Sequence, residues 1–318
     1  MFGYIAKRIV TGVGILLVIV TIVFIAIQTV PGDPALVLLA GNGGAGQVSP
    51  EALDALRARL GLDRPVLEQY LSYMGGLLTG DLGTSFQLQR PVTELILGRL
   101  PNTLELVAIV AVIATALGVF IGASAARGGR AANTIMSLFT ALGISAPVYV
   151  IGTVLVYVAA VSLRILPAGG FVQFDQDPGR HIQLLILPTL AIAVGLTSVI
   201  ARTTRSAVLE TADQDWVRTA TAIGLSRGQV FRGSVLRNSL TPVATVVGLE
   251  IGTLLGATVL VERVFSWPGL STLLIDGVST RDYPVIQGVV IVTAGLFVAI
   301  NILVDVLYTV LDPRARLS

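Results

Sequence analysis

The chain has 318 residues; 54% of them are apolar, 13% are charged, and the mean hydropathy is +0.85. A soluble domain carries about 25% charged residues, so this composition excludes an ordinary soluble protein and indicates a membrane protein. With one histidine, one lysine (Lys7) and no cysteine, the chain cannot by itself form a thiolate site, a disulfide, a His-His metal motif or a Walker-type ATP site.

Six apolar stretches are long enough to cross a bilayer, which requires about 20 residues per helix. The first is expected to be a retained anchor helix within residues 1–30, because its apolar core is longer than that of a signal peptide. Pro147 and Pro188 fall in the third and fourth stretches and should kink those helices. We therefore predict an all-α polytopic membrane protein with six transmembrane helices, at 9–30, 104–126, 135–163, 184–201, 240–261 and 285–311.

The distribution of Lys and Arg between alternate loops indicates the orientation of these spans. The loops on the side of the two termini hold 12 basic residues in 61, whereas the opposite loops hold 9 in 116. Acidic residues show the reverse distribution, 4 against 12. Because cytoplasmic loops are enriched in basic residues, both termini are expected in the cytoplasm.

The loop 31–103 carries helix signals of its own and predicts a small helical element outside the cell. Ser49-Pro50-Glu51 is typical of a helix start, and Gly61 of a helix end. Asp63 is expected to cap a second helix that ends near the Gly75-Gly76 pair or at Gly80. This element is either a surface embellishment or a docking surface for an outside partner, since long ordered loops are often functional.

The cytoplasmic loop 202–239 predicts two short helices joined by a sharp corner. Asp213 or Asp215 is expected to begin the first helix, and Gly224 can end it in a left-handed C-terminal cap. Ser226 can then cap a second helix, which leads into the fifth span.

The surface of this corner admits two interpretations. Small residues at Ala220 and Ala222 would let the backbone of a partner approach, and Trp216 and Leu225 would offer it apolar anchors. From composition alone, a pair of amphipathic helices lying in the lipid interface explains the loop equally well.

Charged residues inside the spans cost about 2.5–3.5 kcal/mol at the bilayer centre, so each needs a partner or a water path. Glu105 lies in the first turn of the second span, where we expect the helix dipole and nearby headgroups to relieve its charge; a role in transport is the less favoured alternative. Asn301 and Asp305 are four residues apart on one face of the sixth span. This spacing favours packing or a salt bridge to a cytoplasmic-side arginine such as Arg202 or Arg205.

Short motifs are spread along nearly the whole chain. They are Pro31-Gly32-Asp33-Pro34, Leu60-Gly61-Leu62-Asp63-Arg64-Pro65, Gly80-Asp81-Leu82-Gly83-Thr84-Ser85, Leu100-Pro101-Asn102-Thr103-Leu104-Glu105-Leu106, Glu262 with Phe265-Ser266-Trp267-Pro268-Gly269, Arg281-Asp282-Tyr283-Pro284, and Asp312-Pro313-Arg314. Their order and spacing resemble those of the dipeptide/oligopeptide permease family of ABC importers, in its B-type subunit. The corner at Gly224 is similar to the "EAA" coupling loop of that family.

The resemblance implies a type I ABC importer permease in the bacterial inner membrane, with a core of five spans in residues 104–318. It implies no catalysis in this chain, because two ATP-binding cassette subunits would bind ATP and magnesium. A second permease of C type would complete the pore, and an extracytoplasmic binding protein would deliver a dipeptide or oligopeptide. The chain would be surrounded by membrane lipid, and no nucleic acid is expected among its partners. The residues expected to couple to the ATPase are Asp215, Trp216, Arg218, Thr219, Ala220, Ala222, Gly224 and Leu225.

Other functions remain as alternatives. Members of the resembled family also carry nickel chelates, so a non-peptide substrate is the nearest alternative. An ion-coupled secondary carrier normally shows clustered intramembrane acids and internal repeats, whereas only three acids lie in these spans. An intramembrane enzyme would need paired carboxylates or a nucleophile–base pair, and the sequence suggests neither.

Span five contains the remaining candidate residues. Gly248, Gly252 and Gly256 form a stripe of small residues at which a neighbouring helix can approach closely. Glu250 is two positions from both Gly248 and Gly252, so it projects to the opposite face of the helix. We expect Glu250 to face the pore or a subunit interface, where it would hold the amino terminus of a peptide or stabilise an intermediate gate.

The corner departs from the family pattern. Thr221-Ala222-Ile223-Gly224 stands where the family commonly has Arg-Ala-Lys-Gly, so two frequent positive charges are missing. We expect the matching groove of the ATPase to be less acidic or more apolar than usual.

Overall fold

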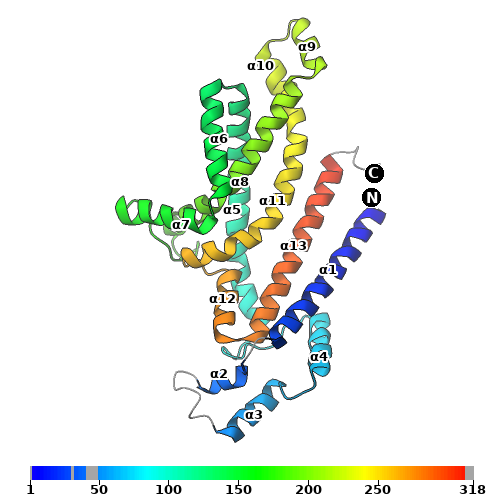
Figure 1. Cartoon of the computed structure of the whole chain (residues 1–318), viewed down its shortest axis with the longest axis vertical. Helices are drawn as coiled ribbons and strands as arrows, with labels where there is room; N and C mark the ends of the chain where they lie inside the picture. The colour runs from blue at the N-terminus through cyan, green and yellow to red at the C-terminus, as the bar shows by residue number, and fades with distance from the viewer. Residues whose placement is uncertain (1, 30–31, 41–48, 312–318) are drawn as a thin grey trace. The chain divides into compact units, whose positions relative to one another are not determined.

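A computed structural model describes residues 2–29, 32–40 and 49–311, with side chains described for residues 7–29, 32–39 and 49–304. Over these residues the chain is helical throughout, apart from loops and one isolated β-bridge between Thr84 and Pro91. The all-α fold class is thereby confirmed. Figure 1 shows the helices in chain order.

The chain forms two compact units. The core unit consists of residues 1–5, 104–267 and 297–318, and the flanking unit consists of residues 6–103 and 268–296. The predicted anchor, 1–30, lies almost wholly in the flanking unit together with the loop 31–103.

Among the described residues, five helices are long and apolar enough to cross a membrane. Each overlaps one of the predicted spans and extends beyond it at one end or at both: α1 (Phe2–Thr29), α5 (Val92–Arg127), α8 (Pro178–Ala212), α11 (Leu236–Val264) and α13 (Tyr283–Leu311). The extensions follow from local helix signals; Asp177 accepts a hydrogen bond from the Arg180 N–H and begins α8 six residues before the apolar stretch at 184. α8 continues without a break past Pro188.

The third predicted span is broken rather than kinked. It is divided into α6 (Arg130–Ser145) and a second piece made of α7 (Val148–Leu155) and the π-helical η2 (Val156–Ser162), with a bend of 107° between them. Pro147 has no N–H, and the preceding Ala146 adopts extended backbone with ψ 125°, as residues before proline do. Figure 1 shows α7 leaving at a large angle to α6. The count of six spans holds if the bent pair is one span.

The flanking unit contains the short helices of the predicted loop element: α2 (Pro34–Ala40), α3 (Pro50–Leu60) and α4 (Val66–Thr79). Ser49 caps α3 by accepting from the Ala52 N–H, and Gly61 ends that helix with φ +70°. Gly80 ends α4 with φ +77°, as the sequence predicts. The expectation for Asp63 is wrong, because α4 begins after Pro65 and no side chain caps it.

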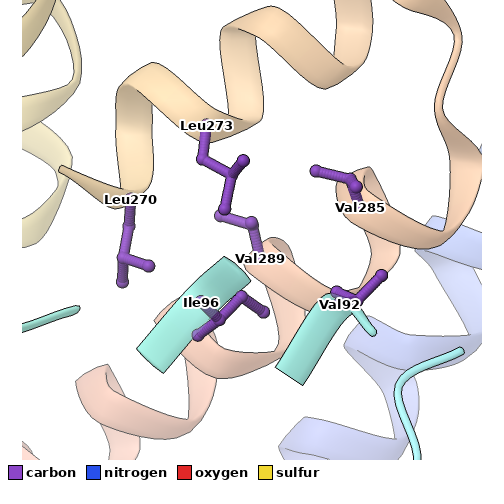
Figure 2. Packing of buried hydrophobic residues seen from close by; sticks show 6 residues of the cluster. All are labelled: Val92, Ile96, Leu270, Leu273, Val285 and Val289. Carbon is purple, nitrogen blue, oxygen red and sulfur yellow. The ribbon is translucent and has the colours of Figure 1, made fainter. Parts of the chain in front are cut away.

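An apolar cluster holds the flanking unit together. Figure 2 shows side chains from the first turns of α5, from α12 (Leu270–Thr280) and from the start of α13 converging on one another: Val92, Ile96, Leu270, Leu273, Val285 and Val289. All six are at most 7% exposed. Burial of this kind contributes about 25 cal/mol per Å² of apolar surface and fixes where these three elements meet.

Sequence motifs that lie far apart meet in this unit. Asp282 is buried and accepts hydrogen bonds from the Ser85 hydroxyl and from the N–H of Phe86 at 3.0 Å. Gly32 lies so close to the Arg281 guanidinium that a Cβ at Gly32 would come within 1.4 Å of its Nη1 atom. Residues of three of the quoted motifs therefore serve the packing of a single structure.

Candidate functional site

The predicted corner is formed by α9 (Asp215–Ala222) and α10 (Arg227–Val230), between the end of α8 and the start of α11 (Figure 1). The Gly224 N–H donates to the Thr221 carbonyl and the Leu225 N–H to the Ala220 carbonyl, which is the Schellman pattern. Gly224 has φ +97°, a conformation that strains residues with a side chain. The predicted left-handed end of the helix is confirmed.

The second helix of the corner starts at Ser226. The Ser226 hydroxyl accepts from the Gln229 N–H, while the Gln229 side chain accepts from the Ser226 N–H, so a complete capping box is present. α10, the π-helical η3 (Phe231–Val235) and α11 form one continuous helix, Arg227–Val264. The corner is thus joined directly to the fifth span.

The corner is held against the spans by a small apolar cluster. Val208 of α8 packs with Val230 and Val235 of the helix that follows the corner, and all three are at most 4% exposed. Partly buried side chains pack against them: Ala126, Trp216, Val217, Ala220, Phe231 and Leu236. α9 therefore lies against α8 and the start of α11 through its own apolar face.

This packing divides the predicted coupling residues into two groups. Trp216 and Ala220 face the cluster, so the structure does not present Trp216 as a free apolar anchor. Thr219, Ala222, Gly224 and Leu225 are exposed. Ile223, which the sequence analysis noted as a departure from the family pattern but did not include among the coupling residues, is 75% exposed and forms the tip together with Leu225 at 44%.

The beginning of α9 carries the charges of the site. Asp215 is the first residue of α9, and its side chain is fully exposed. Arg218 forms an ion pair with Asp213 at 3.0 Å and lies 3.9 Å from Asp215. Exposed pairs of this kind contribute about 0–1 kcal/mol, so their role is to set the local charge rather than to hold the corner together.

The glycine stripe of α11 meets the C-terminal half of α13. A Cβ at Gly248 would lie 2.1 Å from Val304 Cγ1, and one at Gly252 would lie 3.1 Å from both Phe297 and Asn301. Close approach of a neighbouring helix was also predicted at Gly256, but a Cβ there would meet no atom within 4 Å.

Glu250 is half-buried on α11, next to an exposed face formed by Leu249 and Thr253. The Thr253 hydroxyl donates to the Glu250 carbonyl at 2.8 Å. Among the described side chains, Glu250 forms no ion pair. The Asn301 amide donates to the Phe297 carbonyl at 2.8 Å, and the Asp305 side chain lies outside the described residues.

A polar pair that the sequence analysis missed joins two spans in the core unit. His181 of α8 is 2% exposed, and its Nε2 lies 2.9 Å from Glu105 Oε1 of α5. The other ring nitrogen, Nδ1, lies 2.7 Å from the Val172 carbonyl oxygen. The aromatic rings of Phe171, Phe174 and Trp267 surround the imidazole edge to face, at 5.6–5.9 Å between centroids.

These contacts limit where the protons of the pair can lie. A carbonyl oxygen only accepts, so Nδ1 carries a proton and donates to Val172. The contact between Nε2 and Glu105 then requires a further proton, carried either by the imidazole or by the carboxyl group. Glu105 therefore has a protein partner rather than relying on headgroups alone, and the pair ties α5 to α8.

Metal binding has no support in the described part of the chain, where no three His, Asp or Glu side chains gather as ligands would. The flanking unit contains a cavity of about 570 Å³ between α1, the end of α3 and α4. The Tyr73 hydroxyl lines it without a hydrogen-bond partner among the described atoms, and burial raises the pKa of this phenol.

Comparison with known proteins matches two consecutive parts of the chain to one family. Residues 114–317, which contain the corner and the glycine stripe, match the family described as the binding-protein-dependent transport system inner membrane component, and residues 1–107 match its N-terminal part. The chain belongs to this family. Its members are membrane components of transport systems, which agrees with the apolar helices of the structure.

Named relatives of the family cover the whole chain. The dipeptide transport system permease protein DppB of Escherichia coli (strain K12) is 37% identical, with 99% of each chain covered. A protein of Brucella abortus (strain 2308), named as a peptide transport system permease, is 38% identical, also with 99% of each chain covered. A solved structure, the crystal structure of an amino acid ABC transporter with histidines, matches with a TM-score of 0.53 at 18% identity. It covers 70% of this chain and 94% of that chain, and it supports the ABC permease fold.

Proposed function

We propose that this chain is one permease subunit of an ATP-driven importer of dipeptides or oligopeptides. A companion C-type permease forms the other half of the pore, two cytoplasmic ATPase subunits bind ATP and magnesium, and an extracytoplasmic binding protein delivers the peptide. The observation that carries the proposal is the exposed, fully capped corner between two membrane-crossing helices. The chain itself performs no catalysis, and both of its termini are cytoplasmic.

The packing of the corner supports a mechanical role. Its tip, with Ile223 and Leu225, is exposed, whereas the opposite face of α9 packs on Val208 and Val235. Packed interiors transmit displacement because they have few voids. A force applied to the tip when the ATPase subunits close therefore moves α8 and α11 together, which switches the spans between inward- and outward-facing states.

The peptide substrate rests on the names of the relatives at 37% and 38% identity. A nickel chelate or another small solute is the alternative substrate, since the separate binding protein selects the cargo. The loop element of α3 and α4, together with its cavity, is proposed as the surface that meets the binding protein. Deletion of residues 49–80 should then abolish docking of the binding protein while the complex still assembles.

Reconstitution of the complete complex in proteoliposomes tests the proposal. We expect peptide uptake that requires ATP together with both ATPase subunits, and no uptake driven by a proton gradient alone. Since the chain has no cysteine, Ile223→Cys provides a unique thiol in this subunit, and it should cross-link to a cysteine introduced into the ATPase groove. Uptake without ATPase subunits, or an Ile223→Cys thiol that reacts only from outside, would contradict the proposal.

Glu250 is proposed to act in the pore or at the subunit interface. A half-buried carboxylate in a span is costly unless water or a partner group meets it, and the described side chains supply no cation. The positive amino terminus of a peptide would fit this position. Glu250→Gln should reduce the maximal rate of peptide uptake while the complex assembles normally, and unaltered uptake would exclude the role in the pore.

A further inference from the structure

A groove in the core unit lies between the second half of α5 and the helix that follows the corner. Its cavity volume is about 600 Å³, within the range of small-molecule sites, which is about 300–1,000 Å³. Small side chains such as Ala116 and Ser124 line it together with larger apolar ones such as Phe120 and Leu240. Phe120 is 70% exposed, so the groove is open along its side.

The two ends of the groove differ in chemistry. Arg127 and Arg232 line one end, and no acidic residue lines any part of it. The Arg127 guanidinium lies over the Phe231 ring at 4.8 Å from the centroid, which holds it in place by a cation–π contact. Neither arginine forms an ion pair within the described part of the chain.

The position and length of the groove match one leaflet of a bilayer. Arg127 is the last residue of α5, directly after its apolar segment, where a helix leaves the hydrocarbon. From Thr115 to Arg127 the helix rises about 18 Å at 1.5 Å per residue. One leaflet of hydrocarbon is about 15 Å thick, half of the usual 30 Å.

We propose that this groove binds an anionic phospholipid, with one acyl chain along its mostly apolar lining and the phosphate at Arg127 and Arg232. A basic pocket at the end of transmembrane helices matches a negative headgroup in charge, and an apolar trough beside it matches the attached chain. An apolar helix of another subunit would fill the trough but leave both arginines without a negative partner. The site lies at the end of the spans that carries the corner, so a bound lipid stabilises the region through which the corner acts.

Lipid retention by the assembled complex tests the proposal. Native mass spectrometry of the detergent-purified complex, titrated with phosphatidylglycerol or phosphatidylcholine, should show preferential retention of phosphatidylglycerol. Arg127→Gln with Arg232→Gln should weaken that retention by on the order of tenfold or more, because each basic residue contributes to binding of anionic lipid. Arg237→Gln is the matched control, since Arg237 is exposed on the same continuous helix but does not line the groove.

Two results would overturn the proposal. The first is equal retention of both lipids, or retention of phosphatidylglycerol unchanged by the double substitution. The second is a protein occupant. Phe120→Cys adds the only thiol of this chain. Efficient disulfide cross-linking of this thiol to a cysteine of the companion permease would show that a protein helix fills the groove. Reaction of that thiol with a lipid-dissolved maleimide, competed by phosphatidylglycerol, supports the lipid.

Discussion

Gly224 illustrates how one residue determines the shape of the corner. Its φ of +97° is rarely adopted by residues with a Cβ, yet a Cβ there would meet no atom within 4 Å. Glycine is therefore favoured at this position because of its positive φ, and not because a side chain would clash with neighbouring atoms. Gly228, four residues later in α10, also has open space around it but no positive φ.

We predict that Gly224→Ala destabilises the corner by about 1–2 kcal/mol, the cost of a left-handed conformation for an L-residue. Gly228→Ala should be neutral or slightly stabilising, because alanine favours a helix. The measurement is the rate of tryptic cleavage at Arg218 and Arg227, which flank the turn, together with thermal unfolding in detergent. Equal cleavage rates in the two variants would contradict the assignment.

The pair of His181 and Glu105 leads to a second prediction. Glu105→Ala leaves the buried Nε2 of His181 without a partner, which costs about 1–3 kcal/mol. Glu105→Gln can donate an amide N–H to neutral His181 and should retain most of the stability. Thermal unfolding of the purified complex measures both effects, and an alanine variant as stable as the glutamine variant would mean that the contact does not hold α5 to α8.

These two sites differ in what a sequence can predict. The left-handed turn at Gly224 and the cap at Ser226 depend on residues within a few positions, so their signals are local. His181 and Glu105 are 76 residues apart, and nothing near either residue indicates the other. The inward direction of Trp216 is likewise set by its packing on Val208 and Val230, which come from other parts of the chain.

At the scale of helices, alanine substitutions along the glycine stripe of α11 are expected to differ in their effect on stability. A Cβ at Gly248 would lie 2.1 Å from a methyl carbon of Val304, whose β-branched side chain has few other rotamers. We expect Gly248→Ala to destabilise the complex by about 1–3 kcal/mol through overpacking.

Gly256→Ala is the matched control on the same helix, where open space and helix propensity predict no loss of stability. Thermal unfolding and assembly of the two variants, measured side by side, check the difference. A destabilised Gly256→Ala and a tolerated Gly248→Ala would show that the stripe packs against a different neighbour.

Span positions were predictable because apolar length alone nearly determines them, and five helices cover the expected stretches. Their full lengths depend on caps outside the apolar windows, such as Asp177 before α8. Pro147 marked the place where the third span is interrupted, but the bend of 107° could not be predicted, because it depends on how the following residues pack. A proline permits a break without fixing its angle.

At the scale of the whole molecule, the proposed function depends on a surface that would be shared with an ATPase subunit. The corner carries Thr221 and Ile223 where the family resemblance leads us to expect Arg and Lys, and Ile223 is 75% exposed. The partner groove should therefore be apolar or weakly charged. A buried cation without a counter-charge is costly at an interface, whereas an apolar replacement of similar size is not.

We predict that Thr221→Arg with Ile223→Lys lowers ATPase stimulation and peptide uptake with the native ATPase subunits, by on the order of tenfold in apparent affinity. Ile223→Met, which keeps the tip apolar, should retain both activities. The same charged variant should gain coupling to ATPase subunits from a relative whose permease carries Arg and Lys at these positions. The measurement is ATP hydrolysis against ATPase concentration in proteoliposomes for the native chain and both variants. If the charged and the methionine variants couple equally well to both ATPases, the tip does not set the choice of partner, and the recognition must lie in the charged start of α9 at Asp215 and Arg218.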